Sequence, residues 1–254
     1  MSEASTLHSQ RLAAAGFTHG FSTRHGGVSA GAYATLNLGR RVGDDLERLA
    51  ENHRRIAAKI GYDPARLFEA SQVHGVAVLD VGAGADPDAL RPTEADALVA
   101  HHRGDAVGIR TADCVPILIG DRTRGTVAAV HAGWRGVVAG VVARAVDAMH
   151  HADRGAFVAA IGPSIGPCCF EVGDDVADSI VGAVGDDVLI RTEAPRPHVD
   201  LWLAVEHQLR RSGIEIIDTL GACTRCEHDD FYSFRRDGPE SGRMLSVIVA
   251  GGAE

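Results

Sequence analysis

The chain has 254 residues, of which 45% are hydrophobic and 23% charged, and its formal net charge is −9 at pH 7. A chain of this length can bury a substantial core, and the composition is ordinary for a globular protein. General nucleic-acid binding is excluded, because no excess of Lys and Arg is available to neutralise phosphates. No run of residues approaches the ~20 apolar positions that a membrane-spanning helix needs.

The cysteine content and the N-terminal segment indicate the cellular setting. Residues 1–16 are polar and lack the apolar core of a secretory signal. The five cysteines are an odd number, which favours reduced thiols over a disulfide framework. We therefore expect a cytoplasmic protein. We also expect no membrane or nucleic-acid partner, and a monomer or weak homodimer.

In chain order, the sequence predicts alternating groups of strands and helices. Short β-branched runs bounded by Gly, Asp or Pro predict strands over 17–22, 67–72, 76–81, 105–110, 115–119, 126–131, 156–161, 214–218 and 244–250. Apolar residues at helical spacing predict helices over 45–60, 135–151, 172–184 and 198–212, the first capped by Asp44.

The order of these elements predicts the fold class. Around 67–81 and 105–131, strands follow one another without helices, which indicates a mixed or mostly antiparallel sheet. The segment 81–96 reads as a surface loop, and no repeat or linker divides the chain. We expect one domain over 1–254, of α/β (α+β) class, with a mixed sheet flanked by helices.

A predicted β-hairpin brings Cys114 toward His131. Two apolar strands are joined by the turn GDRTRG at 120–125. If the hairpin closes symmetrically, Ile119 faces Thr126, and the ladder continues until Cys114 faces His131. Opposed residues share one face, with Cβ atoms ~4.5–5.5 Å apart. The thiol and the imidazole therefore meet at the open end of the hairpin, provided that the register holds.

His74 has a similar context, because it follows the predicted strand 67–72 and precedes Gly75. Together with Cys114 and His131 it falls at a strand end, where functional sites assemble. Three interpretations stay open: a buried thiol with hydrogen-bonded histidines, a nucleophilic Cys–His dyad, or a three-ligand metal site. A fourth, open position is typical of catalytic zinc, whereas a weak axial Met would indicate copper.

Several long motifs resemble those of the YfiH / laccase-domain family, also called the peptidoglycan editing factor or polyphenol oxidase family. In order they are FSTRHGGVSAGAYATLNLG, QVHG, ADALV, TADCVPILI, VHAGWRG, IGPSIGPCCFEVG and FYSFRRDG…SGRM. The resemblance extends from about Phe21 to the C-terminus. It implies an α/β fold related to the cysteine-hydrolase architecture of the cytotoxic necrotizing factors.

The resemblance also implies an activity and a metal. Zinc would be held by His74, Cys114 and His131, which would then be the catalytic residues. The implied reaction is phosphorolysis of adenosine, inosine and methylthioadenosine, with adenosine deaminase activity in the same pocket, so purine nucleoside and phosphate are the expected partners. The family's other names imply copper-dependent phenol oxidation, or a Cys114 hydrolase that edits peptidoglycan precursors.

Phosphorolysis requires a cationic group that holds phosphate, and Arg suits this role. Arg24 is the first candidate, because Gly26 and Gly27 allow close backbone approach, although a plain turn explains them equally. Asn37 is a candidate for binding the sugar or base. Arg235 is a weaker candidate, since it can instead pair with a neighbouring Asp.

One departure from the family pattern concerns the phosphate contact. The family reads ENR where this chain has Glu51-Asn52-His53, followed by Arg54. If an Arg at that position holds phosphate, Arg54 or His53 would have to replace it.

Deamination requires a carboxylate that is not a metal ligand. Asp113 adjoins Cys114, but neighbouring residues on a strand point to opposite faces, so we expect Asp113 to support the backbone or the ligands. Glu69 and Glu171 stay open as candidates.

The other four cysteines are expected to be non-catalytic. Cys223 and Cys226 have C-x-x-C spacing, which without a second pair is weak evidence for structural zinc. Cys168 and Cys169 are adjacent, and a bond between them would be strained, so we expect them to pack near the pocket.

Overall fold

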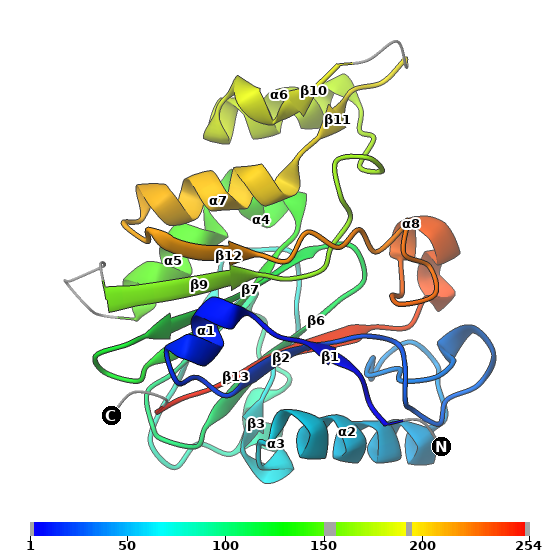
Figure 1. The fold of residues 1–254 in the computed structure, drawn as a ribbon, viewed down its shortest axis with the longest axis vertical. Coiled ribbons are helices and arrows are strands. Elements are labelled where there is room, and N and C mark those ends of the chain that lie inside the picture. The colour runs from blue at the N-terminus through cyan, green and yellow to red at the C-terminus, as the bar shows by residue number, and fades with distance from the viewer. Residues whose placement is uncertain (1–2, 150–155, 192–194, 252–254) are drawn as a thin grey trace.

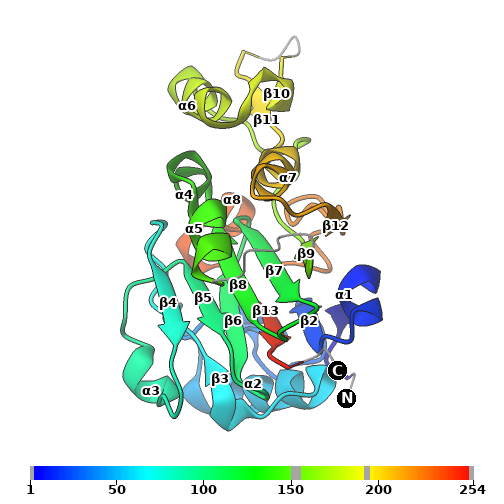
Figure 2. The same cartoon turned by 90° about the vertical axis from the view of Figure 1, so that its left-hand side faces the viewer.

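The computed structural model describes residues 3–149, 156–191 and 195–251. Two large sheets pack against each other, and helices cover their outer faces (Figures 1 and 2). The mixed α/β fold is confirmed, but its strands divide between two sheets instead of forming one.

The first sheet has the strand order β1-β2-β13-β6-β3, in which only β3 and β6 pair in parallel. Its strands are β1 (Thr6–Leu7), β2 (His19–Ser22), β3 (Leu67–Phe68), β6 (Ala106–Thr111) and β13 (Met244–Val249).

The second sheet has the order β12-β9-β7-β8-β5-β4, in which β4 with β5 and β9 with β12 pair in parallel. Its strands are β4 (Val78–Val81), β5 (Ala97–Ala100), β7 (Val115–Asp121), β8 (Val127–Ala132), β9 (Phe157–Ile161) and β12 (Ile216–Thr219). A separate antiparallel pair joins β10 (Leu189–Ile190) to β11 (His198–Val199).

The helices cover the outer faces of the sheets. They are α1 (Gln10–Ala14), α2 (Leu46–Ile60), α3 (Pro87–Leu90), α4 (Trp134–Ala139), α5 (Val141–Ala148), α6 (Asp174–Val184), α7 (Leu201–Arg211) and α8 (Phe234–Asp237). Helices α4, α5 and α7 pack against the second sheet, α6 packs on α4 and α7, and α2 lies against the first sheet (Figure 1). No helix in the described part of the chain is long and apolar enough to cross a membrane.

Burial on both faces explains the apolar sequence of β7. Leu118 faces the core between the two sheets, whereas Ile117 and Ile119 face the helices. A strand that is buried on both sides reads as a continuous apolar run rather than an alternating one. The centre of the second sheet is therefore a rigid support for the residues at its strand ends.

Three expected element boundaries need correction. The predicted helix 135–151 is two helices, because Gly140 adopts a left-handed conformation (φ 84°) between them; its last two positions lie outside the described residues. The helix predicted over 198–212 begins at Leu201, since His198–Val199 form β11. Asp45, not Asp44, caps α2 by accepting hydrogen bonds from two N–H groups of its first turn.

Candidate metal and active site

The hairpin of β7 and β8 brings Cys114 and His131 together in a register different from the expected one. His131 pairs with Pro116, and Val115 pairs with Ala132, so the predicted pairing of Cys114 with His131 is wrong by two residues. A shift of two keeps every side chain on its face. Continued by one step, the observed register sets Cys114 opposite Gly133, with His131 as the diagonal neighbour on the same face, within reach of its side chain.

Asp96 fixes the orientation of His131. Its Oδ1 atom lies 2.7 Å from His131 Nδ1, and both side chains are buried. This contact leaves Nε2 as the ring nitrogen available to a ligand, an arrangement common in metal sites. Asp96 precedes β5, a strand that the sequence did not predict, and the role of Asp96 was not predicted either. Its signal was a carboxylate directly before the apolar run Ala97–Ala100.

The same carboxylate shapes the loop that carries His74. Asp96 accepts hydrogen bonds from the backbone N–H groups of Val73, His74 and Gly75. His74 adopts a positive φ of 62°, which is uncommon for a residue with a side chain. Although burial opposes ionisation, the bonds from His131 and from this loop hold the pKa of Asp96 below its usual value. One buried carboxylate therefore positions both histidines.

The thiol of Cys114 is electrostatically coupled to these histidines. Burial alone would raise the pKa of Cys114, but the charge of His131 and hydrogen bonds from His131 and His74 lower it to about 6. Burial alone would lower the pKa of His131, but the charge of Cys114 and hydrogen bonds with Asp96 and Cys114 raise it to about 9. The site therefore favours a thiolate, the form of cysteine that binds metals or acts as a nucleophile.

The geometry fits a metal ion. One donor atom each from His74, Cys114 and His131 lies within 4.8 Å of the other two, and the two imidazole rings meet edge to face. Two nitrogens and one sulfur are a donor set that zinc and copper accept. A Cβ atom at Gly133 would lie 2.9 Å from His74 Cδ2 and 3.2 Å from Cys114 Sγ, so only glycine leaves this space open.

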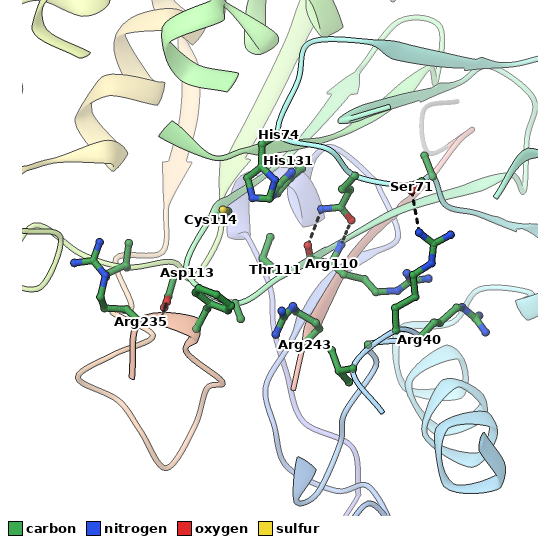
Figure 3. Close-up of a pocket in the computed structure, with 18 of the residues that line it drawn as sticks. Arg40, Ser71, His74, Arg110, Thr111, Asp113, Cys114, His131, Arg235 and Arg243 are labelled. Atoms are coloured by element: carbon green, nitrogen blue, oxygen red, sulfur yellow. Dashed lines mark hydrogen bonds between the residues drawn. The ribbon is translucent and has the colours of Figure 1, made fainter. Parts of the chain in front are cut away.

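These three residues lie at one side of a cavity of ≈ 640 Å³ (Figure 3). The cavity is also lined by six arginines, and Asp113 supplies the only carboxylate among the described lining residues. The arginines are Arg40, Arg41, Arg91, Arg110, Arg235 and Arg243. A cavity with this balance of charge attracts anions.

A buried carboxylate outside the cavity lining holds two of these arginines. Glu69 is 2% exposed and pairs with Arg40 at 3.2 Å and with Arg110. The charges of Arg110 and Arg40 outweigh the effect of burial and lower the pKa of Glu69. Glu69 therefore orients the guanidinium groups and does not itself face the cavity.

Arg235 and Asp113 both line the cavity, but through different groups. Asp113 lies between β6 and β7 and adopts a positive φ of 89°. Its carboxylate accepts hydrogen bonds from Thr224 Oγ1 and from the N–H of Arg235, both at 2.6 Å. The guanidinium of Arg235 lies 5.4 Å from the ring of Phe170.

The other three predicted substrate contacts lie elsewhere. Arg24 donates hydrogen bonds to the carbonyls of Ala34 and His228 and stacks on Tyr232. Asn37 is fully buried. Its side chain accepts hydrogen bonds from the N–H groups of Gly39 and Arg243 and donates one to Asp44, and it does not line the cavity.

Arg54 is exposed on α2 and pairs with Glu51 at 2.8 Å. Its neighbour His53 is buried but does not line the cavity. Neither residue therefore occupies a position in this cavity where it could replace an arginine that contacts phosphate. Glu171 also lies outside the lining and receives a hydrogen bond from Arg235 through its carbonyl oxygen.

Comparisons with known proteins show which proteins this chain is similar to. The family model described as "Multi-copper polyphenol oxidoreductase laccase" matches residues 18–251. The purine nucleoside phosphorylase SCO2081 of Streptomyces coelicolor is 41% identical, with 94% of this chain and 98% of the relative covered. The adenosine deaminase RL5 of an unknown prokaryotic organism is 38% identical, with 90% and 92% covered. The crystal structure of the YfiH protein of Bacillus licheniformis superposes with a TM-score of 0.86, at 30% identity over 92% of this chain and 93% of the other.

Proposed function

The chain belongs to the polyphenol oxidoreductase laccase family, the YfiH family, and on this basis we propose that it is a metal-dependent purine nucleoside phosphorylase. The observation that carries the proposal is the arginine-lined cavity beside His74, Cys114 and His131. Relatives named purine nucleoside phosphorylase and adenosine deaminase give the same class of substrate.

The cavity offers separate surfaces to the two substrates. Arg40 and Arg110 lie on one side of the cavity, away from Arg235 and Asp113, and Arg243 lies between these two groups (Figure 3). Guanidinium groups bind phosphate through paired charge-assisted hydrogen bonds. Phe170 and Phe234 also line the cavity and supply aromatic surface against which a purine can stack. In this arrangement phosphate is held for attack on the sugar carbon that carries the base.

Zinc is the metal that we propose, held by His74, Cys114 and His131, and when bound it would supply a Lewis acid at the cavity wall. The chain's own residues prepare this position. Asp96 keeps the proton of His131 on Nδ1 and fixes the loop of His74. The arginines of the phosphate surface bind and orient the anion without any proton transfer, because guanidinium stays protonated.

Adenosine deamination is a secondary activity in this proposal. Deaminases of nucleobases use a carboxylate that is not a metal ligand as acid and base. Among the described lining residues only Asp113 carries a carboxylate, and both of its oxygens already accept hydrogen bonds. Phosphorolysis requires a cationic site for phosphate, which the arginines supply, and is the reaction that the cavity supports better.

One observation favours a second candidate, a metal-independent Cys114 hydrolase. Asp96, His131 and Cys114 form a chain of hydrogen-bonded groups that resembles the Cys–His–carboxylate arrangement of cysteine hydrolases. Such an enzyme needs one histidine, whereas here His74 also contacts the thiol. The metal-dependent phosphorylase is therefore our preferred proposal.

Product analysis with two nucleosides tests the proposal. Metal-replete protein is incubated with inosine or adenosine, with and without inorganic phosphate, and the products are separated by chromatography. We expect hypoxanthine and adenine that require phosphate, and slower conversion of adenosine to inosine that does not. Base release that is equal without phosphate would indicate a hydrolase and overturn the proposal.

A further inference from the structure

The four cysteines other than Cys114 form one cluster outside the cavity. The Sγ atoms of Cys168, Cys169, Cys223 and Cys226 all lie within 4.8 Å of one another. The sulfur of Cys226 is 3.3 Å from that of Cys169 and 3.5 Å from that of Cys168. None of the four residues lines the cavity. The fold therefore places a second cysteine pair, Cys168 and Cys169, beside the C-x-x-C pair.

Parallel strand pairing brings the two pairs together across the chain. Strands β9 and β12 run in parallel, and the segments that follow them stay paired through a bridge between Ser164 and Cys223. The N–H of Thr224 donates to the carbonyl of Ser164 at 3.0 Å. The turn that carries Cys168 and Cys169 follows this bridge in the chain. It is closed by a hydrogen bond from the N–H of Cys169 to the carbonyl of Gly166. The backbone therefore fixes both cysteine pairs.

Backbone N–H groups surround one of the sulfurs. Gly166 donates to Cys223 Sγ at 3.2 Å. The backbone N–H groups of Cys226 and Arg225 also lie within hydrogen-bonding reach of this sulfur. N–H groups that converge on a sulfur stabilise a thiolate and fix its direction, as surrounding hydrogen bonds do for metal ligands. Arg225 and Cys226 stand two and three positions after Cys223, so the C-x-x-C turn itself supplies these donors.

We propose that Cys168, Cys169, Cys223 and Cys226 bind one zinc ion in a tetrahedral structural site. A tetrahedron with Zn–S bonds of ~2.3 Å has sulfurs about 3.8 Å apart, a spacing that fits this cluster. A cluster of several iron atoms requires wider separation of the sulfurs. Binding replaces thiol protons with the metal, and no electron is transferred.

The ion would link two segments that adjoin residues of the cavity. Cys169 adjoins Phe170, which lines the cavity, and Cys223 adjoins Thr224, which holds the carboxylate of Asp113. Both segments lie outside regular helices and strands, and metal coordination would restrict their motion. The site is therefore independent of the proposed chemistry but stabilises the residues around it.

Cobalt substitution in a Cys114→Ala protein tests this site alone, because every remaining cysteine belongs to the cluster. The reduced protein is expected to bind one cobalt ion per chain at the cluster, with intense thiolate-to-cobalt charge-transfer bands and the visible bands of tetrahedral cobalt. Zinc should displace the cobalt and abolish these bands. Zinc content after gel filtration gives a second measurement.

A matched pair of variants locates the ion. In the Cys114→Ala background, Cys226→Ser should lose the thiolate bands and at least one zinc per chain, whereas Arg225→Ser, an exposed residue between the two cysteines, should keep both. If Cys226→Ser fails to fold, the spectrum of the parent protein still decides. A fully reduced Cys114→Ala protein that shows no thiolate bands with cobalt overturns the proposal.

Discussion

His131 Nδ1 lies 2.7 Å from Asp96 Oδ1, and the same carboxylate holds the loop of His74 through three backbone N–H groups. Two of the three proposed metal ligands, from segments almost 60 residues apart in sequence, therefore depend on one buried side chain. This dependence makes Asp96 the residue through which the metal site can be tested without removing a ligand.

Asp96→Asn is expected to weaken zinc binding at the cavity by roughly 10- to 100-fold, the usual effect of losing a residue that orients a metal-bound histidine. The amide keeps the size of the carboxylate but loses its charge. Competition against a chromophoric chelator measures the affinity. Asp80→Asn is the matched control, because Asp80 pairs with His101 at 3.0 Å, is about half exposed and lies outside the cavity lining. Equal affinities in both variants would contradict the role of Asp96.

Gly133→Ala is expected to displace a ligand, because its Cβ atom would lie 2.9 Å from the His74 ring. We expect loss of metal affinity of at least about tenfold, since ligand orientation is disturbed, while the protein still folds. The control is Gly182→Ala on α6, where a Cβ atom meets nothing within 4 Å. That substitution should stabilise the protein by about 0.5–1 kcal/mol. Calorimetric zinc titration and thermal unfolding compare the two, and undiminished zinc binding by Gly133→Ala would count against the geometry.

The phosphate side of the cavity is tested at Arg243. Loss of a charge-assisted hydrogen bond to phosphate costs about 1.5–3 kcal/mol, so Arg243→Ala should lower kcat/KM for phosphate by roughly 10- to 100-fold. Steady-state kinetics with inosine at saturation measure this change. Arg54→Ala should leave it unaltered, because Arg54 lies on the exposed face of α2. If the Arg54 variant is the impaired one, the phosphate site lies elsewhere.

The lowered pKa of His53 predicts that the free energy of unfolding depends on pH. Burial lowers its pKa from 6.5 to about 4, although Glu69 opposes the shift. The unfolded chain therefore binds more protons between these values. This contribution to stability is fully present above pH 6.5 and is lost as the pH falls toward 4. Between pH 7 and pH 5 the loss is about 2 kcal/mol.

Urea unfolding at these two pH values checks this effect of His53. His53→Gln, which does not titrate, should lose less stability between pH 7 and pH 5 than the wild-type protein, by about that amount. Identical losses in the two proteins would show that His53 is not held in its neutral form.

The sequence predicted that His74, Cys114 and His131 lie close together, but not the contacts that position them. Alternation along β7 and β8 limits which residues share a face, so a register error of two still left Cys114 and His131 together. Asp96 was missed because it ends a segment that reads as a loop, and its partners come from two other segments. A buried carboxylate is recognised only when those partners are known.

For the predicted substrate contacts, the sequence does not show the direction of the side chain. Arg24 follows a predicted strand and adjoins two glycines, yet its guanidinium bonds to backbone carbonyls. Local sequence shows that an arginine is near a turn, but not which way its long side chain extends. The four-cysteine cluster was equally inaccessible, because its two pairs are brought together only by the parallel pairing of β9 with β12.

The metal dependence of phosphorolysis is tested by measuring ribose 1-phosphate formed from inosine and phosphate by the same protein before and after removal of its metal. We expect stoichiometric ribose 1-phosphate and hypoxanthine from the zinc-loaded protein, almost none from the metal-free protein, and recovery when zinc is restored. We expect no recovery in Cys114→Ala. Formation of ribose 1-phosphate at an unchanged rate by the metal-free or Cys114→Ala protein would contradict this metal dependence.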